Sequence, residues 1–172
     1  MYRKATAADL DSIWKIYDAV LTREEAGLSS VGWVRNIYPT PEIFARSLAA
    51  GELFVCETED GILAAARINK IQGEEYRQAG WTIPAEDHQV MVLHTLAVAP
   101  FAQSKGIGKG FVQFYEQYAL QNGCTVARLD TNVRNTPGRR LYPSLGYQEA
   151  GVVPCIFNGI ENVLLCCYEK AL

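Results

Sequence analysis

The clearest pattern in the chain is an apolar run followed by a helical stripe. Between Val90 and Val98, apolar residues occupy both alternating sets of positions, which is typical of a central strand buried on both faces. Pro100 ends the run, because proline cannot donate to a strand ladder. After a short polar loop, apolar residues recur at helical spacing, at positions 107, 111, 114, 115, 118 and 119. The pattern predicts a buried strand, a glycine-containing loop and an amphipathic helix in succession.

The part of the chain before this strand alternates between helical and strand periodicity. Its expected elements are a strand at 2–5, a helix from Thr6 to about Gly27, a helix from Pro41 to Gly51, and strands at 53–57 and 62–71. Residues 27–40 are irregular, and Glu59-Asp60-Gly61 is typical of a hairpin turn. The polar segment 72–89 is either a binding loop or a solvated surface excursion.

The remaining elements complete a mixed fold. They are a strand at 125–131, a short helix that begins at Asn135 and ends at Gly146, and strands at 147–153 and 163–169 joined through 154–162. The order β-α-α-β-β-β-α-β-α-β-β indicates the α+β class, with a mostly antiparallel central sheet flanked by helices. One parallel step is implied, where strand 90–98 crosses through a helix to strand 125–131. We expect residues 1–172 to form a single domain.

Composition excludes several classes of function. A formal net charge of −3 gives no basic footprint for nucleic acid, and no apolar run is long enough to span a membrane. The N-terminus has no signal-peptide core, and the five cysteines form no C-x-x-C pair, which favours a reducing, cytoplasmic location. With only two histidines present, no metal site is expected. The cysteines are Cys56, Cys124, Cys155, Cys166 and Cys167.

The loop after the central strand is suited to bind phosphate. Gly106 and Gly108 leave the backbone accessible, and the N–H groups at a helix start favour anions. The alternative is that the glycines only make a tight turn. A P-loop is excluded by spacing, and a dinucleotide fingerprint lacks its third glycine because position 111 is Phe.

Two motifs resemble those of the GCN5-related N-acetyltransferase (GNAT) superfamily. Residues Gln103 to Gly108 match the acetyl-CoA signature [QR]-x-x-G-x-[GA], directly after a strand similar to that of the family. Residues Asn135 to Tyr147 are similar to the family pattern N-x-x-[AG]-x-x-L-Y-x-x-x-G-[FY]. Both stand in the family's order, and the earlier elements fit the family's opening, so the resemblance spans nearly the whole chain.

The resemblance implies roles for specific residues. Backbone groups of Leu96, Ala97 and Val98 would hydrogen-bond the pantetheine arm of acetyl-CoA. Asn135 would contact the donor near its thioester, and Tyr142 would protonate the departing thiolate. The residues implied to hold the pyrophosphate are Gln103, Ser104, Lys105, Gly106, Ile107, Gly108 and Lys109.

The general base and the acceptor site are less defined by sequence. His94 is either a core residue or the base, and Asp130 with Asn132 is an alternative that would hold a relaying water. Pro143 departs from the family pattern and predicts a kink that displaces Tyr142. Four aromatic residues in the long connections are expected to line the acceptor pocket: Trp33, Tyr38, Tyr76 and Trp81.

These features favour an enzyme that moves the acetyl group of acetyl-CoA to a primary amine by direct attack in a ternary complex. The acceptor would be a small-molecule or peptide amine, and the resemblance makes a homodimer possible. Two alternatives stay open at this level. One is a non-catalytic acyl-CoA-binding regulatory module, and the other is a nicotinamide-dinucleotide-binding protein.

Overall fold

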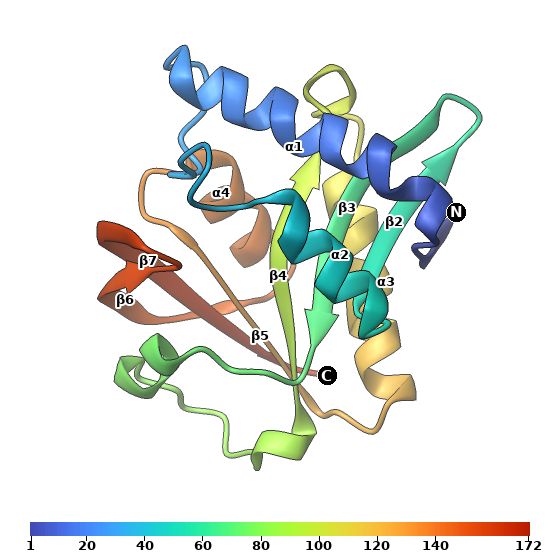
Figure 1. The fold of residues 1–172 in the computed structure, drawn as a ribbon. Helices are drawn as coiled ribbons and strands as arrows, with labels where there is room; N and C mark the ends of the chain where they lie inside the picture. Colours follow the sequence, from blue (N-terminus) through green and yellow to red (C-terminus); the bar gives the residue numbers. More distant parts are fainter.

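One seven-stranded sheet organises the protein, with helices on both faces (Figure 1). The computed structural model describes all residues, 1–172, and its strand order is β1-β2-β3-β4-β5-β7-β6. The strands and helices are β1 Tyr2–Lys4, α1 Leu10–Glu25, α2 Pro41–Ala49, β2 Leu53–Thr58, β3 Gly61–Asn69, β4 Val90–Val98, α3 Ile107–Gln121, β5 Val126–Asn132, α4 Thr136–Ser144, β6 Gln148–Phe157 and β7 Ile160–Ala171. Only β4 and β5 pair in parallel, which confirms the predicted α+β class. None of the helices is long and apolar enough to cross a bilayer.

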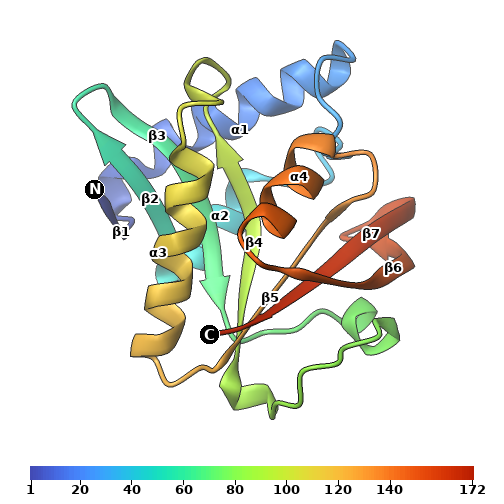
Figure 2. The same cartoon turned by 180° about the vertical axis from the view of Figure 1, so that it is seen from behind.

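Two helical layers enclose the sheet. Helices α1 and α2 cover one face, while α3 and α4 lie on the other (Figures 1 and 2). Tyr17 of α1 stacks on Phe44 of α2 with ring centroids 4.2 Å apart, and both are buried. On the opposite face, the Tyr115 hydroxyl of α3 donates to the Met91 carbonyl at 2.6 Å and to the Arg128 carbonyl at 3.0 Å. This side chain therefore joins α3 to β4 and β5 where those strands run side by side.

The segment 72–89 contributes one side chain, Tyr76, to the core and is otherwise half-buried or exposed. It contains short 3₁₀ turns at Glu74–Gln78 and Asp87–Gln89 and runs along one end of the sheet (Figure 1). Its Tyr76 is buried in a cluster with Val90, Val92 and Val126. The alternative of a solvated excursion therefore does not hold for Tyr76, which covers part of the parallel strand pair, while many other side chains of the segment are exposed.

A β-bulge interrupts β4 at Thr95. In the ladder with β3, Ala65 pairs with Ala97 and Arg67 with His94, so β4 carries one extra residue here. Thr95 has a φ of 57°, a left-handed conformation that is uncommon for a β-branched residue. Side chains along a strand alternate between the two faces of the sheet, and the extra residue reverses this alternation. Even-numbered residues of β4 therefore face one side of the sheet before Thr95 and the other side after it.

Two tyrosine hydroxyls hold the bulge. Tyr17 donates to the Thr95 carbonyl at 2.6 Å and to the Ala65 carbonyl at 3.0 Å. The Tyr38 hydroxyl, from the connection between α1 and α2, hydrogen-bonds the Thr95 hydroxyl. Pairing between β4 and β5 ends at Leu93 and Leu129, and beyond that point the two strands diverge (Figure 1).

The last two strands differ from the sequence prediction. The segment 154–162 was expected to be a connection, yet β6 and β7 form a hairpin that turns at Asn158 and Gly159. Both residues have positive φ, as a tight hairpin turn requires. Pro154 is accommodated because β6 is the edge strand, where a missing donor costs no ladder bond. The strand expected at 62–71 is also shorter, because the Asn69 side chain accepts from the Ile71 N–H and ends it.

Removing the Tyr17 hydroxyl tests how much the bulge depends on it. In Tyr17→Phe, two carbonyls lose their donor in a buried site, so we expect a loss of about 1–3 kcal/mol in the free energy of unfolding. Tyr118→Phe is the matched control, since it keeps the ring contact with Phe54 and removes a partly exposed hydroxyl. Urea denaturation of both variants gives the comparison, and equal small losses would contradict the role of Tyr17.

Candidate active site

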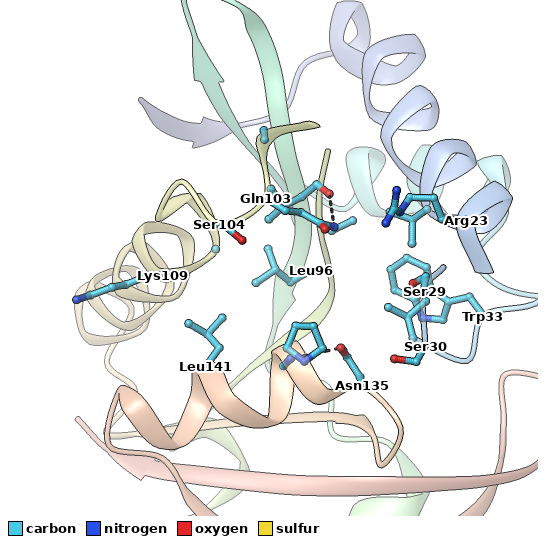
Figure 3. Close-up of a pocket in the computed structure, with 18 of the residues that line it drawn as sticks. Arg23, Ser29, Ser30, Trp33, Leu96, Gln103, Ser104, Lys109, Asn135 and Leu141 are labelled. Atoms are coloured by element: carbon cyan, nitrogen blue, oxygen red, sulfur yellow. Dashed lines mark hydrogen bonds between the residues drawn. The ribbon is translucent and has the colours of Figure 1, made fainter. Parts of the chain in front are cut away.

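A cleft of about 470 Å³, here called the main cleft, opens where β4 and β5 diverge (Figure 3). Residues 96–98 of β4 form its floor, and the loop 103–109 and helix α4 form one side. The segment 28–33 after α1 faces them across the opening, where Figure 3 shows Ser29, Ser30 and Trp33 opposite Leu141. Three stretches that are far apart in sequence, 28–33, 96–109 and 135–142, therefore meet at one concave surface.

The floor of the main cleft is an unpaired strand edge. Val98 pairs with Ala64 and Ala97 with Ala65, so β3 occupies one edge of this part of β4. The other edge has no partner, because pairing with β5 ends at Leu93. The Gln103 amide reaches the Val98 carbonyl at 3.5 Å, a long contact that an incoming ligand can replace. An extended ligand that carries amide groups can therefore pair with this edge as a strand would.

The loop 103–109 presents the start of α3 to the cleft. Gly106 has a φ of 82° and precedes the helix, whose first backbone bond runs from the Gly110 N–H to the Gly106 carbonyl. The N–H groups of residues 107–109 thus lack helical acceptors, as at any helix start. A Cβ on Gly108 would lie 3.6 Å from Leu141 and 3.8 Å from Val98. The backbone is therefore open to an anionic ligand at this point.

Most of the predicted loop residues line the main cleft. Gln103, Ser104, Gly106, Gly108 and Lys109 do so, together with the strand residues Leu96, Ala97 and Val98. Lys105 is exposed outside the lining, and the Ile107 side chain packs against the core. Of Lys105 and Ile107, only the backbone and not the side chain is in a position to contact the pyrophosphate, as the resemblance implied.

Helix α4 lines the same side of the main cleft as the loop. The Asn135 carboxamide begins the helix by accepting from the Gly138 N–H at 3.3 Å, and it donates to the Thr131 hydroxyl at 2.8 Å. These two bonds hold Asn135 at the cleft, where it was predicted to act. The side chain is thus oriented by β5 as well as by its own helix.

Tyr142 lies on the wall of the main cleft, and Pro143 does not end the helix that carries it. Pro143 falls in the last turn of α4, so the helix continues through Tyr142 to Ser144. The ring packs against Tyr147 and Tyr168, with centroids 6.0 and 5.7 Å away. Burial raises the pKa of the Tyr142 phenol, so the group keeps its proton at neutral pH. The structure therefore places a protonated tyrosine among the residues that line the cleft.

His94 lies outside the main cleft. Its Nε2 is 2.9 Å from the Asn69 Oδ1, and since that oxygen also accepts from the Ile71 N–H, the imidazole is the donor. Burial and the nearby Arg67 guanidinium lower the pKa of His94 to about 3. A neutral imidazole with so low a pKa is a poor acceptor for an ammonium proton. The structure supports the core interpretation of His94 and not its role as the base.

The predicted acceptor aromatics divide into two groups. Trp33 and Tyr38 line a smaller cavity of about 60 Å³, here called the inner cavity, which shares Leu96, Asn135 and Tyr142 with the main cleft. Tyr76 lines neither cavity, although its hydroxyl donates to Asp130, which lines the inner cavity. Trp81 is not brought to either cavity.

Trp81 lies on a different surface. Its indole stacks over the Arg128 guanidinium at 4.3 Å and its N–H donates to the Tyr76 carbonyl. It lines a separate hollow with Lys70, Gln72 and Asp87. The acceptor role predicted for Trp81 is not supported, because the segment 72–89 folds this side chain away from the site.

Several lining residues were not predicted from sequence. Arg23, Ser29 and Ser30 face the main cleft from α1 and its following segment, and Phe157 lines the inner cavity from the β6–β7 hairpin. The Asn158-Gly159 turn was the available signal for Phe157, since it places the preceding residue at a hairpin end. No three His, Cys, Asp or Glu side chains lie close enough together to hold a metal ion.

A family model for the acetyltransferase (GNAT) family matches residues 13–147, most of the chain. The chain belongs to the GNAT family. A curated relative, the uncharacterized N-acetyltransferase YhfO of Bacillus subtilis (strain 168), is 36% identical over 61 residues. That match covers 36% of this chain and 41% of YhfO, so it spans less than half of the relative's length. The family resemblance of the two sequence motifs is confirmed.

Solved structures confirm the GNAT fold over the whole chain. A GNAT-family acetyltransferase from Streptococcus agalactiae 2603 is 22% identical with a TM-score of 0.80, covering 100% of this chain and 95% of the other. The ribosomal-protein-alanine N-acetyltransferase of Brucella melitensis is 21% identical with a TM-score of 0.73, covering 100% and 99%. The Salmonella typhimurium protein yncA, solved with acetyl-CoA, is 18% identical with a TM-score of 0.68, covering 100% and 93%.

The altered environment of His94 is directly measurable. Since its pKa lies at about 3, the imidazole should stay neutral from pH 8 down to pH 5. We expect its ring resonances in NMR spectra to stay constant over this range, with a His94→Asn variant to assign them. A titration with a midpoint near 6.5, the ordinary value for histidine, would contradict the buried placement.

Proposed function

We propose that this GNAT-family protein transfers the acetyl group of acetyl-CoA to a primary amine by direct attack in a ternary complex. The observation that carries the proposal is the meeting, in one cleft, of an unpaired strand edge, an open helix start and a buried protonated tyrosine. Each of these meets one requirement of the donor: amide pairing, anion binding and protonation of the leaving group.

The main cleft has the size and chemistry for acetyl-CoA. Its volume of about 470 Å³ lies within the range of small-molecule sites. The pantetheine arm carries amides that pair with the free edge of Leu96 to Val98, and the helix start at residues 107–109 suits the pyrophosphate. The yncA structure with acetyl-CoA supports this assignment at the level of a shared fold.

Tyr142 is the proposed acid for the departing thiol. A thiolate is a fair leaving group, because a thiol has a pKa near 8.5. A neutral phenol beside it speeds departure by giving the sulfur a proton as the carbon–sulfur bond breaks. The raised pKa of Tyr142 keeps that proton in place until the sulfur needs it.

Direct attack is favoured over an acyl-enzyme route. Cys56, Cys124, Cys166 and Cys167 are buried. The remaining thiol, Cys155, has its pKa raised to about 11 by burial and nearby carboxyl groups, which disfavours the reactive thiolate. The inner cavity instead leads an acceptor to the same tyrosine that borders the donor site.

The structure also bears on the alternatives. A nicotinamide-dinucleotide site of the usual kind needs a parallel, doubly wound sheet, whereas only one strand pair here is parallel. A non-catalytic binding module would need no protonated tyrosine between two connected cavities. The small-molecule or peptide nature of the amine, a cytoplasmic location, a single-domain organisation and a homodimer stay predictions.

The pyrophosphate assignment is tested by a branched side chain at Gly108. Gly108→Val should fold, because a Cβ there meets only ordinary van der Waals contacts, while its methyl groups would block the helix start. We expect calorimetry to show at least a tenfold loss of CoA affinity, on the order of 1.4 kcal/mol. Gln117→Val, on the exposed side of the same helix, controls for the valine itself. Equal CoA affinity in both variants would exclude this site.

The acid is tested by the matched pair Tyr142→Phe and Tyr147→Phe. Both keep the aromatic ring, and the Tyr147 hydroxyl is buried without a hydrogen-bond partner away from the cleft lining. We expect kcat for CoA release to fall roughly 10²–10⁴-fold in Tyr142→Phe, with CoA affinity unchanged. Tyr147→Phe should keep the wild-type kcat. If Tyr142→Phe matches wild type with chemistry rate-limiting, the tyrosine only packs.

A further inference from the structure

A carboxyl group borders the inner cavity beside the proposed site of acetyl transfer. Asp130, on β5, lines this cavity together with Tyr142 and Leu96, which also line the main cleft. The aromatic side chains of Trp33, Tyr38 and Phe157 complete much of the wall. The volume of the inner cavity, about 60 Å³, is much smaller than that of the main cleft, about 470 Å³.

Asp130 has no cationic partner in the protein. Its Oδ2 accepts one hydrogen bond, at 2.7 Å from the Tyr76 hydroxyl, and it takes part in no ion pair. Arg67 is engaged with Glu52, and Arg128 pairs with Glu169. A carboxylate that is largely removed from water normally has a cation or several donors, so the half-buried Asp130 is suited to receive a positive charge from outside the chain.

Glu24, which lines a neighbouring hollow, is already engaged within the protein. Both carboxylate oxygens of Glu24 accept from the Val31 and Gly32 N–H groups, and Glu24 also contacts Arg134. These bonds hold the segment that carries Trp33 against the C-terminal end of α1. Asp130 is therefore the carboxyl that combines access to the inner cavity with an unused charge.

We propose that Asp130 binds the ammonium group of the acceptor and accepts its proton, with Tyr76 as the positioning residue that orients the carboxylate. This inference rests on the proposed acetyl transfer and assigns the acceptor class: a primary amine that arrives as a cation and enters between aromatic faces. Such faces attract cations, which adds to the carboxylate charge.

The proton movements balance in this scheme. Asp130 takes one proton from R–NH₃⁺, and the nitrogen lone pair of R–NH₂ forms a bond to the thioester carbon. When the carbon–sulfur bond breaks, its electron pair goes to sulfur, which takes the Tyr142 phenol proton. The second nitrogen proton restores the phenol, and Asp130 returns its proton to solvent. The products are the acetamide, the free thiol of CoA and one proton.

The surroundings of Asp130 give the scheme a measurable pH dependence. Burial raises the pKa of Asp130 to about 6, the Tyr76 hydrogen bond lowers it, and nearby Glu75 raises it. The titratable groups that face Asp130 from the neighbouring elements are Tyr38, Glu75, Tyr76, Tyr142, Cys155 and Cys167. The carboxyl must be ionised to bind an ammonium group, so kcat/KM should fall as the pH drops below about 6.

This fall of kcat/KM below about pH 6 is the acid limb of the pH profile. Two substitutions should move the acid limb in opposite directions along the pH axis. Tyr76→Phe removes the donor that stabilises the carboxylate, so the limb should shift to higher pH. Glu75→Gln removes a neighbouring negative charge, so the limb should shift to lower pH. A purely structural role for these residues would lower activity without opposite shifts in pH.

The experiment measures CoA thiol release from acetyl-CoA with a panel of primary amines between pH 5 and 9. Asp130→Asn should lose roughly 10²–10⁴-fold in kcat/KM near pH 7, with CoA affinity unchanged by calorimetry. Its remaining rate should rise with the fraction of neutral amine and should lack the limb near pH 6. If Asp130→Asn does not fold, the opposite shifts in Tyr76→Phe and Glu75→Gln carry the test.

The outcomes separate this inference from the proposed function. If wild type binds CoA but releases thiol with no amine, acetyl transfer fails and the role of Asp130 fails with it. If wild type releases thiol while Asp130→Asn keeps both the rate and the acid limb, only the role of Asp130 is overturned. The role of Asp130 would likewise be overturned if the acid limb stays at the wild-type pH in both Tyr76→Phe and Glu75→Gln.

Discussion

The left-handed conformation of Thr95 is the constraint on which the site depends. It is costly for a threonine, and persists because Tyr17 and Tyr38 both hydrogen-bond that residue. The extra residue turns the end of β4 away from β5, and the strand edge left between Leu96 and Val98 has no partner. Without the bulge, continued pairing with β5 would close the edge that the main cleft exposes.

The hydrogen bond between Tyr38 and Thr95 also links the main cleft, proposed for the acetyl donor, to the inner cavity, proposed for the acceptor. Tyr38 holds the Thr95 hydroxyl and also lines the inner cavity, while its ring packs edge-on against Phe157, 5.2 Å away. The element that keeps the strand edge open therefore also helps to shape the space into which an amine would enter. Since Trp33 packs against both Tyr17 and Tyr38, the connection after α1 is fixed to the bulge by side chains and not only by its ends.

Sequence patterns predicted the features that depend on local chemistry. The apolar run at 90–98, the helix start after Gly106 and the Asn135 cap depend on neighbouring residues, and the structure has all three. The Thr95 bulge could not be predicted in this way, because its stabilising partners come from α1 and the following connection. His94 was undecided for the same reason, since Asn69 lies on another strand.

The positions of Tyr76 and Trp81, whose rings pack 5.1 Å apart beside a separate hollow, show why the acceptor side was harder to predict. The segment 72–89 has to cover Val90, Val92 and Val126, and the Tyr76 ring fills that core while its hydroxyl extends through to Asp130. Trp81, five residues on, caps the same core from outside and stacks on Arg128. Neither ring lines the inner cavity, and which of the two side chains reaches Asp130 depends on how the segment folds against the sheet. Periodicity in the segment itself carries no information about that. The burial of Tyr76 thus serves packing, and its one polar atom links that packing to the carboxyl of the inner cavity.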